Sequence, residues 1–141
     1  MNPMISVLSA IPDGQSISYA DFAKAVGPIA NSIAFAQPQS LSRQGSVVTI
    51  ACAGAGTDSS PKGSISHQAT VTATVSETAT SVTLDNIQGI TAHNSDGLGG
   101  TVTKVVITPM SNGHFQLTVT VSLGFFSDTI NEELDQNGQL V

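Results

Sequence analysis

The chain has 141 residues, with ten acidic and four basic side chains, and its formal net charge is −6 at pH 7. This length suits one folded domain, and we expect residues 1–141 to form a single unit. An acidic surface repels a phosphate backbone, so the composition argues against nucleic-acid binding. No apolar run reaches the length of about 18 residues that a membrane-spanning helix needs, which argues against a membrane span.

The beginning of the chain does not resemble a secretory signal. Residues 1–10 hold a short apolar run without a preceding Lys or Arg. We therefore expect synthesis without a signal peptide, or a chain from which a leader was removed. Cys52 is the only cysteine, which excludes an intrachain disulfide and the class of small disulfide-rich secreted proteins.

The first predicted element is a short helix over about residues 19–26. Its apolar side chains recur at the spacing of one helical face, at Tyr19, Phe22, Ala23 and Val26. Ser18 followed by Asp21 is typical of a helix start, and Gly27 with Pro28 predicts the end. Residues 29–36 fit either a further helical turn or a strand.

From about residue 46 to residue 126, apolar residues recur with the period of two that is typical of β strands. Residues 47–53 predict a buried strand, and the Gly- and Ser-rich residues 54–63 predict a loop. The next strand has one apolar face, formed by Ala69, Val71, Ala73 and Val75. We expect a reversal near Glu77 and a return strand containing Val82 and Leu84.

The remaining chain predicts two more strands and an acidic tail. Residues 93–100 predict a loop, and residues 101–108 predict a strand that ends before the turn signal at Asn112 and Gly113. A strict alternation follows, with Phe115, Leu117, Val119, Val121, Leu123 and Phe125 on one face. The acidic tail, residues 128–141, has a helix-capping pattern from Thr129 to Glu132 and predicts a short helix or a frayed end.

These elements predict a mostly β fold. We expect an antiparallel β-sandwich or open barrel of about six to eight strands, with one short N-terminal helix. A fixed-period repeat is missing from the sequence, which argues against a solenoid or a propeller.

A search for catalytic and metal-binding chemistry points to neither. Cys52 lies between two alanines in an apolar run, so we expect a buried, inert thiol. His67, His93 and His114 are scattered, and we expect surface or turn residues rather than zinc ligands. Asp58 and residues 93–96 offer oxygen atoms but lack the spacing of a calcium loop. We expect no enzyme activity, no cofactor and no metal site.

One surface feature is unusual for an antiparallel sheet. The outward positions of three predicted strands carry hydroxyl groups instead of charges, at Thr70, Thr72, Thr74, Thr101, Thr103, Thr118 and Thr120. Lys104 is the only charged residue within these strands. Such a face costs less to desolvate than a charged one, so these threonines are candidate interface residues. The alternative is that Thr is simply a good strand former on a solvated surface.

We therefore expect a noncatalytic, self-assembling structural β protein, of the composition found in the capsid, decoration or tail proteins of a virion. Its partners would be further copies of the chain or other structural subunits. A second possibility is a binding or adhesive module that uses the loops at residues 54–63 and 93–100. A third, an ice- or membrane-binding surface built on the threonine rows, needs a regular repeat that the sequence lacks.

Overall fold

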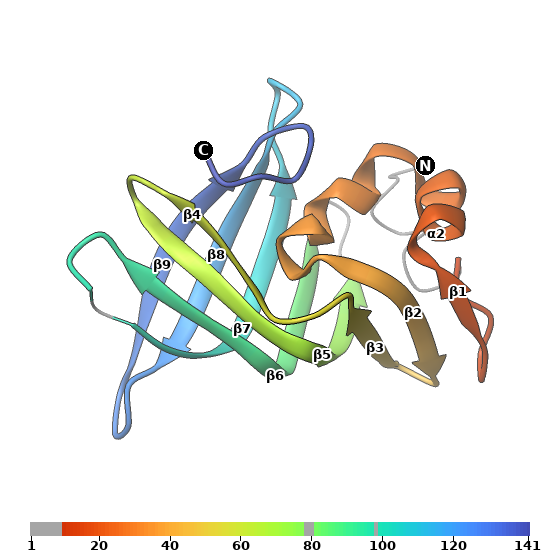
Figure 1. Ribbon diagram of the computed structural model, residues 1–141, viewed down its shortest axis with the longest axis horizontal. Coiled ribbons are helices and arrows are strands. Elements are labelled where there is room, and N and C mark those ends of the chain that lie inside the picture. The colour runs from red at the N-terminus through yellow and green to blue at the C-terminus, as the bar shows by residue number, and fades with distance from the viewer. Residues whose placement is uncertain (1–9, 78–80, 98) are drawn as a thin grey trace.

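The computed structural model describes residues 10–77, 81–97 and 99–141, and one antiparallel sheet dominates it (Figure 1). The strand order is β1-β2-β3-β5-β6-β7-β8-β9, and β4 pairs with β5. In chain order the strands are β1 Ser16–Ser18, β2 Pro38–Gln44, β3 Val47–Cys52, β4 Gly56–Ser60, β5 Gly63–Glu77, β6 Val82–Asn94, β7 Gly99–Pro109, β8 Phe115–Ser122 and β9 Ser127–Leu134. The predicted mostly β class is confirmed, although the described residues form nine strands rather than six to eight.

The predicted short helix is confirmed as α2, Tyr19–Val26. The Ser18 side chain accepts a hydrogen bond from the Asp21 backbone N–H at 3.1 Å, which is the capping contact that the sequence indicates. Gly27 ends the helix with a φ of 66°, a conformation that suits glycine. The ambiguous segment that follows is a 3₁₀ helix, η2, Gly27–Ala36. Figure 1 shows both helices together at one end of the sheet.

Strand β8 shows why the core forms where it does. Phe115, Leu117, Val119 and Val121 are buried, and the residues between them are partly exposed. The predicted continuation of this inward row to Phe125 is wrong, because β8 ends at Ser122 and Phe125 is fully exposed. A tight turn follows Leu123, whose N–H donates to the Phe126 carbonyl at 2.9 Å. The chain reverses there, so position parity no longer determines which side chains are inside.

Strands β5 and β6 form the predicted hairpin, with Glu77 opposite Val82. The turn itself, expected near Glu77, includes residues outside the described part of the chain. The inward face of β5 is confirmed for Val71, Ala73 and Val75 but is wrong for Ala69, which is exposed. The reason is a shift in the β5–β6 register between His67 and Thr72, which displaces the intervening residues from the ladder.

Two further expectations are corrected by the structure. Residues 54–63 are not simply a loop, because they contain β4, which pairs with the start of β5. The acidic segment after residue 127 is neither a helix nor frayed, because it forms β9 and pairs with the whole of β8. In β9 the inward positions are Ile130, Glu132 and Leu134. Because one inward residue is a glutamate, the sequence of β9 lacks the regular alternation of apolar and polar residues that predicts a strand.

Candidate assembly surface

The outer face of the sheet consists of cross-strand rows of mainly uncharged side chains. The register aligns three such rows across the strands, and all of their side chains are exposed or partly exposed. The first row is Val47, Thr74, Asp85, Lys104, Thr120 and Thr129; the second is Ser76, Thr83, Val106, Thr118 and Asn131; the third is Ser66, Thr91, Thr101, Ser122 and Ser127. We call these three rows the hydroxyl face.

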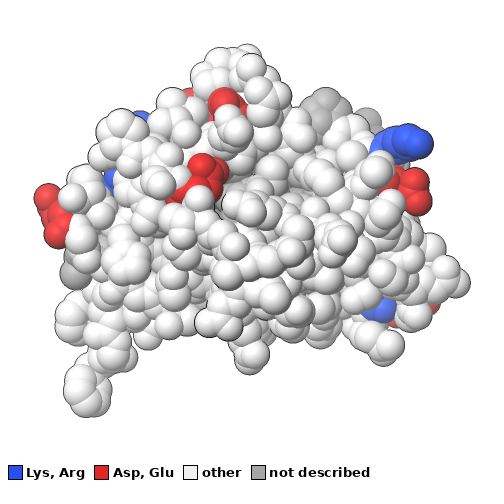
Figure 2. All heavy atoms as spheres, in the orientation of Figure 1, with Lys and Arg blue, Asp and Glu red and all other residues white. Residues whose placement is uncertain are grey.

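The hydroxyl face contains only two charged side chains, Asp85 and Lys104, which lie opposite each other in the register of β6 and β7. Opposite charges in directly paired positions favour each other and leave no net charge on the row. In the view of Figure 2, acidic and basic side chains are few and scattered over the surface rather than gathered in one patch. Electrostatic repulsion between two copies of this face is therefore small.

The structure brings the predicted threonines onto this face to different degrees. Thr74 and Thr120 belong to the first row, Thr118 to the second and Thr101 to the third. Of the others, Thr72 lies opposite Thr49, Thr70 lies opposite Ala51, and Thr103 is an extra residue in a shift of the β7–β8 register. Their outward placement follows the predicted pattern, and their role as an interface stays a prediction.

Strands β8 and β9 pair over their full length without a register shift, and the row positions Thr118, Thr120, Ser122, Ser127, Thr129 and Asn131 form an uncharged strip along them, beside the exposed Asp128. The side chains of this strip carry hydroxyl groups, with one amide at Asn131. The Thr118 hydroxyl donates to the Asn131 side-chain oxygen at 3.4 Å, a long contact between neighbours on this strip. A charge occurs beyond the strip at Glu133, which is paired with His114.

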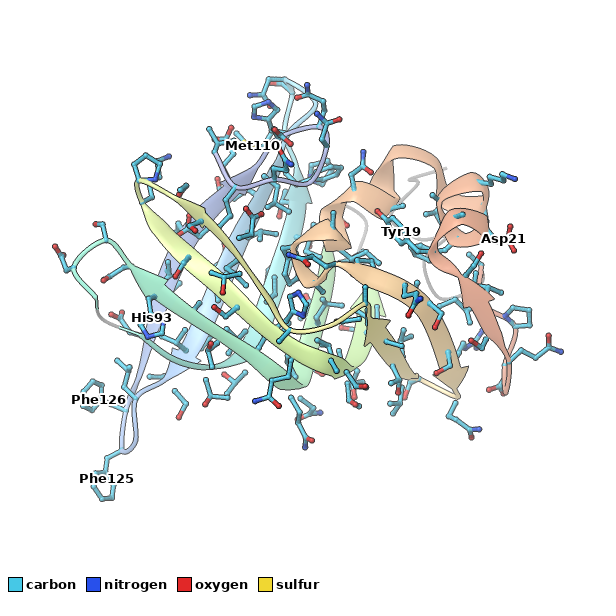
Figure 3. The ribbon with its side chains drawn as sticks, in the orientation of Figure 1. Tyr19, Asp21, His93, Met110, Phe125 and Phe126 are labelled. Carbon is cyan, nitrogen blue, oxygen red and sulfur yellow. The ribbon has the colours of Figure 1, made fainter. Side chains whose placement is uncertain are left out.

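The β8–β9 hairpin ends in an apolar tip that the sequence pattern placed in the core. Phe125 is fully exposed and Phe126 is 67% exposed. Figure 3 shows both rings directed away from the body of the protein at the end of the hairpin. Residues 123–126 form the turn at this tip, and Gly124 has a φ of 91° there. The signal that could have revealed it is Gly124 itself, because a glycine with positive φ is typical of hairpin turns.

The cysteine and the three histidines lie on different strands or turns. Cys52 is buried as predicted, its thiol lies 2.8 Å from the Ala36 carbonyl, and burial raises the pKa of the thiol. His93 is exposed and His114 pairs with Glu133, but His67 is buried, so the expected surface position of His67 is wrong. The cause is that β5 starts earlier than predicted and places residue 67 inward.

Metal-binding residues do not cluster in the described part of the chain, where no group of three or more His, Cys, Asp or Glu side chains could hold an ion. Asp58 belongs to β4, and its carboxylate accepts the Leu140 N–H at 3.1 Å. At the other predicted loop, the Asn94 side chain accepts the Asp96 N–H at 3.0 Å, which closes a polar turn. The Asp58 carboxylate therefore ties β4 to the C-terminal residues, and the Asn94 oxygen stabilises its own turn.

One buried acid, Glu132, makes no side-chain hydrogen bond to the described residues. Glu132 on β9 is 2% exposed, and neither of its carboxylate oxygens has a hydrogen-bond partner there. Burial raises the pKa of Glu132, and the positive charge of Lys62 partly opposes this rise. The carboxylate also lies against β5, where a Cβ atom added at Gly63 would come within 2.7 Å of it.

Comparison with known proteins adds no functional assignment, because no protein-family model, no curated protein and no solved structure matches the chain. Among the described residues, none of the helices combines the length and apolar character needed to cross a membrane.

Proposed function

We propose that the chain is a noncatalytic structural protein that assembles through its hydroxyl face, as a subunit of a larger particle such as a virion shell or tail. The observation that carries this proposal is the near absence of charge from the three rows that cross the described sheet. Burying hydroxyl and methyl groups requires modest hydrogen-bond compensation, whereas burying an unpaired ammonium group costs several kcal/mol. A face of this kind can pack against a second protein surface.

The surroundings of the face agree with this use. In the first row the only charges are opposite in sign and lie at opposed register positions, so the row can be covered without burying a net charge. The neighbouring Glu133 carboxylate contacts His114 Nδ1 at 2.5 Å. Protein interfaces are depleted of charge at their centre, and the two charges in the middle of the first row have opposite signs.

The test is to place charge at the centre of the strip. Thr118→Lys with Thr120→Lys should leave the monomer folded, because both side chains point away from the core, and should abolish assembly. Light scattering after size exclusion gives the molar mass. The matched control carries Ser111→Lys and Gln136→Lys, which add the same charge at exposed turn positions. If the Thr118/Thr120 variant assembles as the unmodified protein does, the hydroxyl face is not the interface.

A second candidate function is a small-ligand binding module, and one pocket favours it. This pocket has a volume of about 320 Å³ and lies between η2, the strand β4 and the C-terminal turn. Gln37, Thr57, Asp58 and Gln139 line it with polar groups. It includes part of the predicted loop at residues 54–63 but none of residues 93–100. Thermal melting against panels of small polar compounds, with Thr57→Trp to fill the pocket, would identify such a ligand.

A further inference from the structure

The exposed phenylalanines of the β8–β9 hairpin tip are the largest apolar side chains on the described surface. Burying a phenyl group is favourable, and this free energy is not gained while the ring stays in water. Aromatic side chains are also common anchors of protein interfaces. Residues 123–126 connect β8 and β9, and the hairpin holds both phenyl rings away from the core of their own chain. The two phenyl rings of the tip are therefore available to pack against another molecule.

A suitable receptor exists on the hydroxyl face. A surface pocket of about 330 Å³ opens where β5 and β6 lose their register. Its lining includes Ser66, His67, Gln68, Ile90, Thr91 and Thr101 and contains no Asp, Glu, Lys or Arg. A cavity of about 150 Å³ is enough to bind benzene, so this pocket has room for a phenyl ring. We call it the bulge pocket.

The bulge pocket is a consequence of the backbone. Between the pairs His67–Ile90 and Thr72–Gln88, β5 advances by five residues while β6 advances by two, so extra residues of β5 leave the ladder. At Gly89, which has a φ of 94°, the backbone of β6 lies close to the backbone of β5. Only glycine fits there without a shift, because an added Cβ would lie 2.7 Å from the Thr70 carbonyl oxygen. Such bulges often mark functional sites in sheets.

The tip and the pocket belong to the same end of the sheet. The third row of the hydroxyl face runs from Ser66 through Thr91 and Thr101, which line the pocket, to Ser122 and Ser127, which flank the hairpin tip. Neighbouring strands are about 4.8 Å apart, so the pocket and the base of the hairpin are separated by a few strand spacings. A surface that presents an apolar projection beside an uncharged hollow is complementary to another copy of itself.

We propose that the Phe125–Phe126 tip of one copy inserts into the bulge pocket of a second copy. This inference rests on the proposed self-assembly and names its anchoring contact. The polar pocket near Asp58 is a poorer receptor for a phenyl ring, because insertion there would desolvate a carboxylate. The lining of the bulge pocket contains no carboxylate, and its one titratable side chain is His67, whose buried Nε2 atom has no hydrogen-bond partner among the described residues.

Two variants test the two halves of the contact. Phe125→Ser with Phe126→Ser removes the anchor, and Thr91→Lys places a charged side chain at the pocket. Each variant alone should weaken self-association by about 30-fold or more, which corresponds to the loss of at least one buried phenyl group. The controls are Val141→Ser, which removes a different exposed apolar side chain, and Ser95→Lys, which adds charge to the nearby turn.

Mixing the two variants gives the decisive result. The Thr91→Lys protein keeps an intact tip and the Phe125/Phe126 variant keeps an intact pocket, so one complementary contact is restored between them. Sedimentation velocity should show a heterodimer in the mixture and monomers in each separate sample. Normal assembly of the tip variant, or a mixture that stays monomeric, would overturn the tip–pocket contact. Assembly that resists both variants but fails in the Thr118/Thr120 variant would overturn this contact alone and leave the proposed function standing.

Discussion

Glu132 is the residue whose position is hardest to explain by stability. It points into the core from β9, the last strand of the sheet, and its carboxylate has no hydrogen-bond partner among the described residues. An inward charge on an edge strand discourages another chain from pairing with that edge, since extension of the sheet would bury the charge more deeply. We interpret Glu132 as protection against uncontrolled edge pairing, at a cost in stability.

Replacing this carboxylate tests the cost. Because burial raises the pKa of Glu132, the folded state binds a proton more tightly than the unfolded chain, and stability falls as pH rises from about 4.3, the usual Glu value, through the raised pKa. Glu132→Gln should remove this decline and be more stable than the parent at neutral pH, with the difference shrinking in acid. Urea unfolding at a series of pH values measures it. Asp96→Asn, at an exposed turn, is the control, and an equal change in both variants would contradict the account.

The reactivity of Cys52 is a second prediction about a single residue. Its thiol is buried and burial raises its pKa, so the reactive thiolate is scarce at neutral pH. A thiol reagent should modify Cys52 slowly in the native protein and quickly in denaturant. Ala53→Cys in a Cys52→Ala background places a thiol at the next position, which is exposed, and should react at once. Equal native rates for the two thiols would show that Cys52 is accessible.

Among the elements, α2 was predicted from sequence to its bounds because its signals are local. The cap at Ser18, the apolar spacing and the stop at Gly27 all lie within one short segment. The strands β4 and β9 and the bend in β5 depend on distant partners. In β9, burial of a glutamate breaks the expected pattern, and in β5 the register shift moves Ala69 outward although its parity points inward. Local sequence patterns do not determine such pairing with distant strands.

The helix gives a quantitative test of packing at this scale. Phe22 is 1% exposed and belongs to the same core as the inward residues of the sheet. Phe22→Ala should lower the free energy of unfolding by about 3 kcal/mol or more. Lys24→Ala, on the exposed side of the same helix, should change it by less than about 0.5 kcal/mol. Denaturant melts of both variants decide the point, and a small loss for Phe22→Ala would mean that the helix contributes little to the core.

For the candidate site, the sequence predicted which threonines point outward but not how the strands align them. The three rows exist because the order and register of β5 to β9 place residues from separate strands side by side. The bulge pocket could not be predicted from the sequence for the same reason, and the exposed tip is indicated only by Gly124. One arises from a mismatch between two strands, and the other arises because the chain turns before Phe125.

At the scale of the whole molecule, the hydroxyl face and the edge strand β9 differ in their content of charged residues. The hydroxyl face carries little charge, whereas the edge strand β9 carries Asp128, Glu132 and Glu133. These acidic residues disfavour extension of the sheet by another strand, and the face remains open to packing. The account therefore predicts discrete assembly through the face rather than growth through the edge.

The most direct test is the molar mass of the unmodified protein as a function of concentration and salt. The monomer mass is 14.4 kDa. Sedimentation equilibrium should show a larger species that grows in proportion as concentration rises and that is unchanged between about 0.05 and 0.5 M salt, because salt screens charges and this interface is nearly free of them. A mass of 14.4 kDa at every concentration, for the protein alone and in extracts of its native source, would contradict the central claim that this chain assembles.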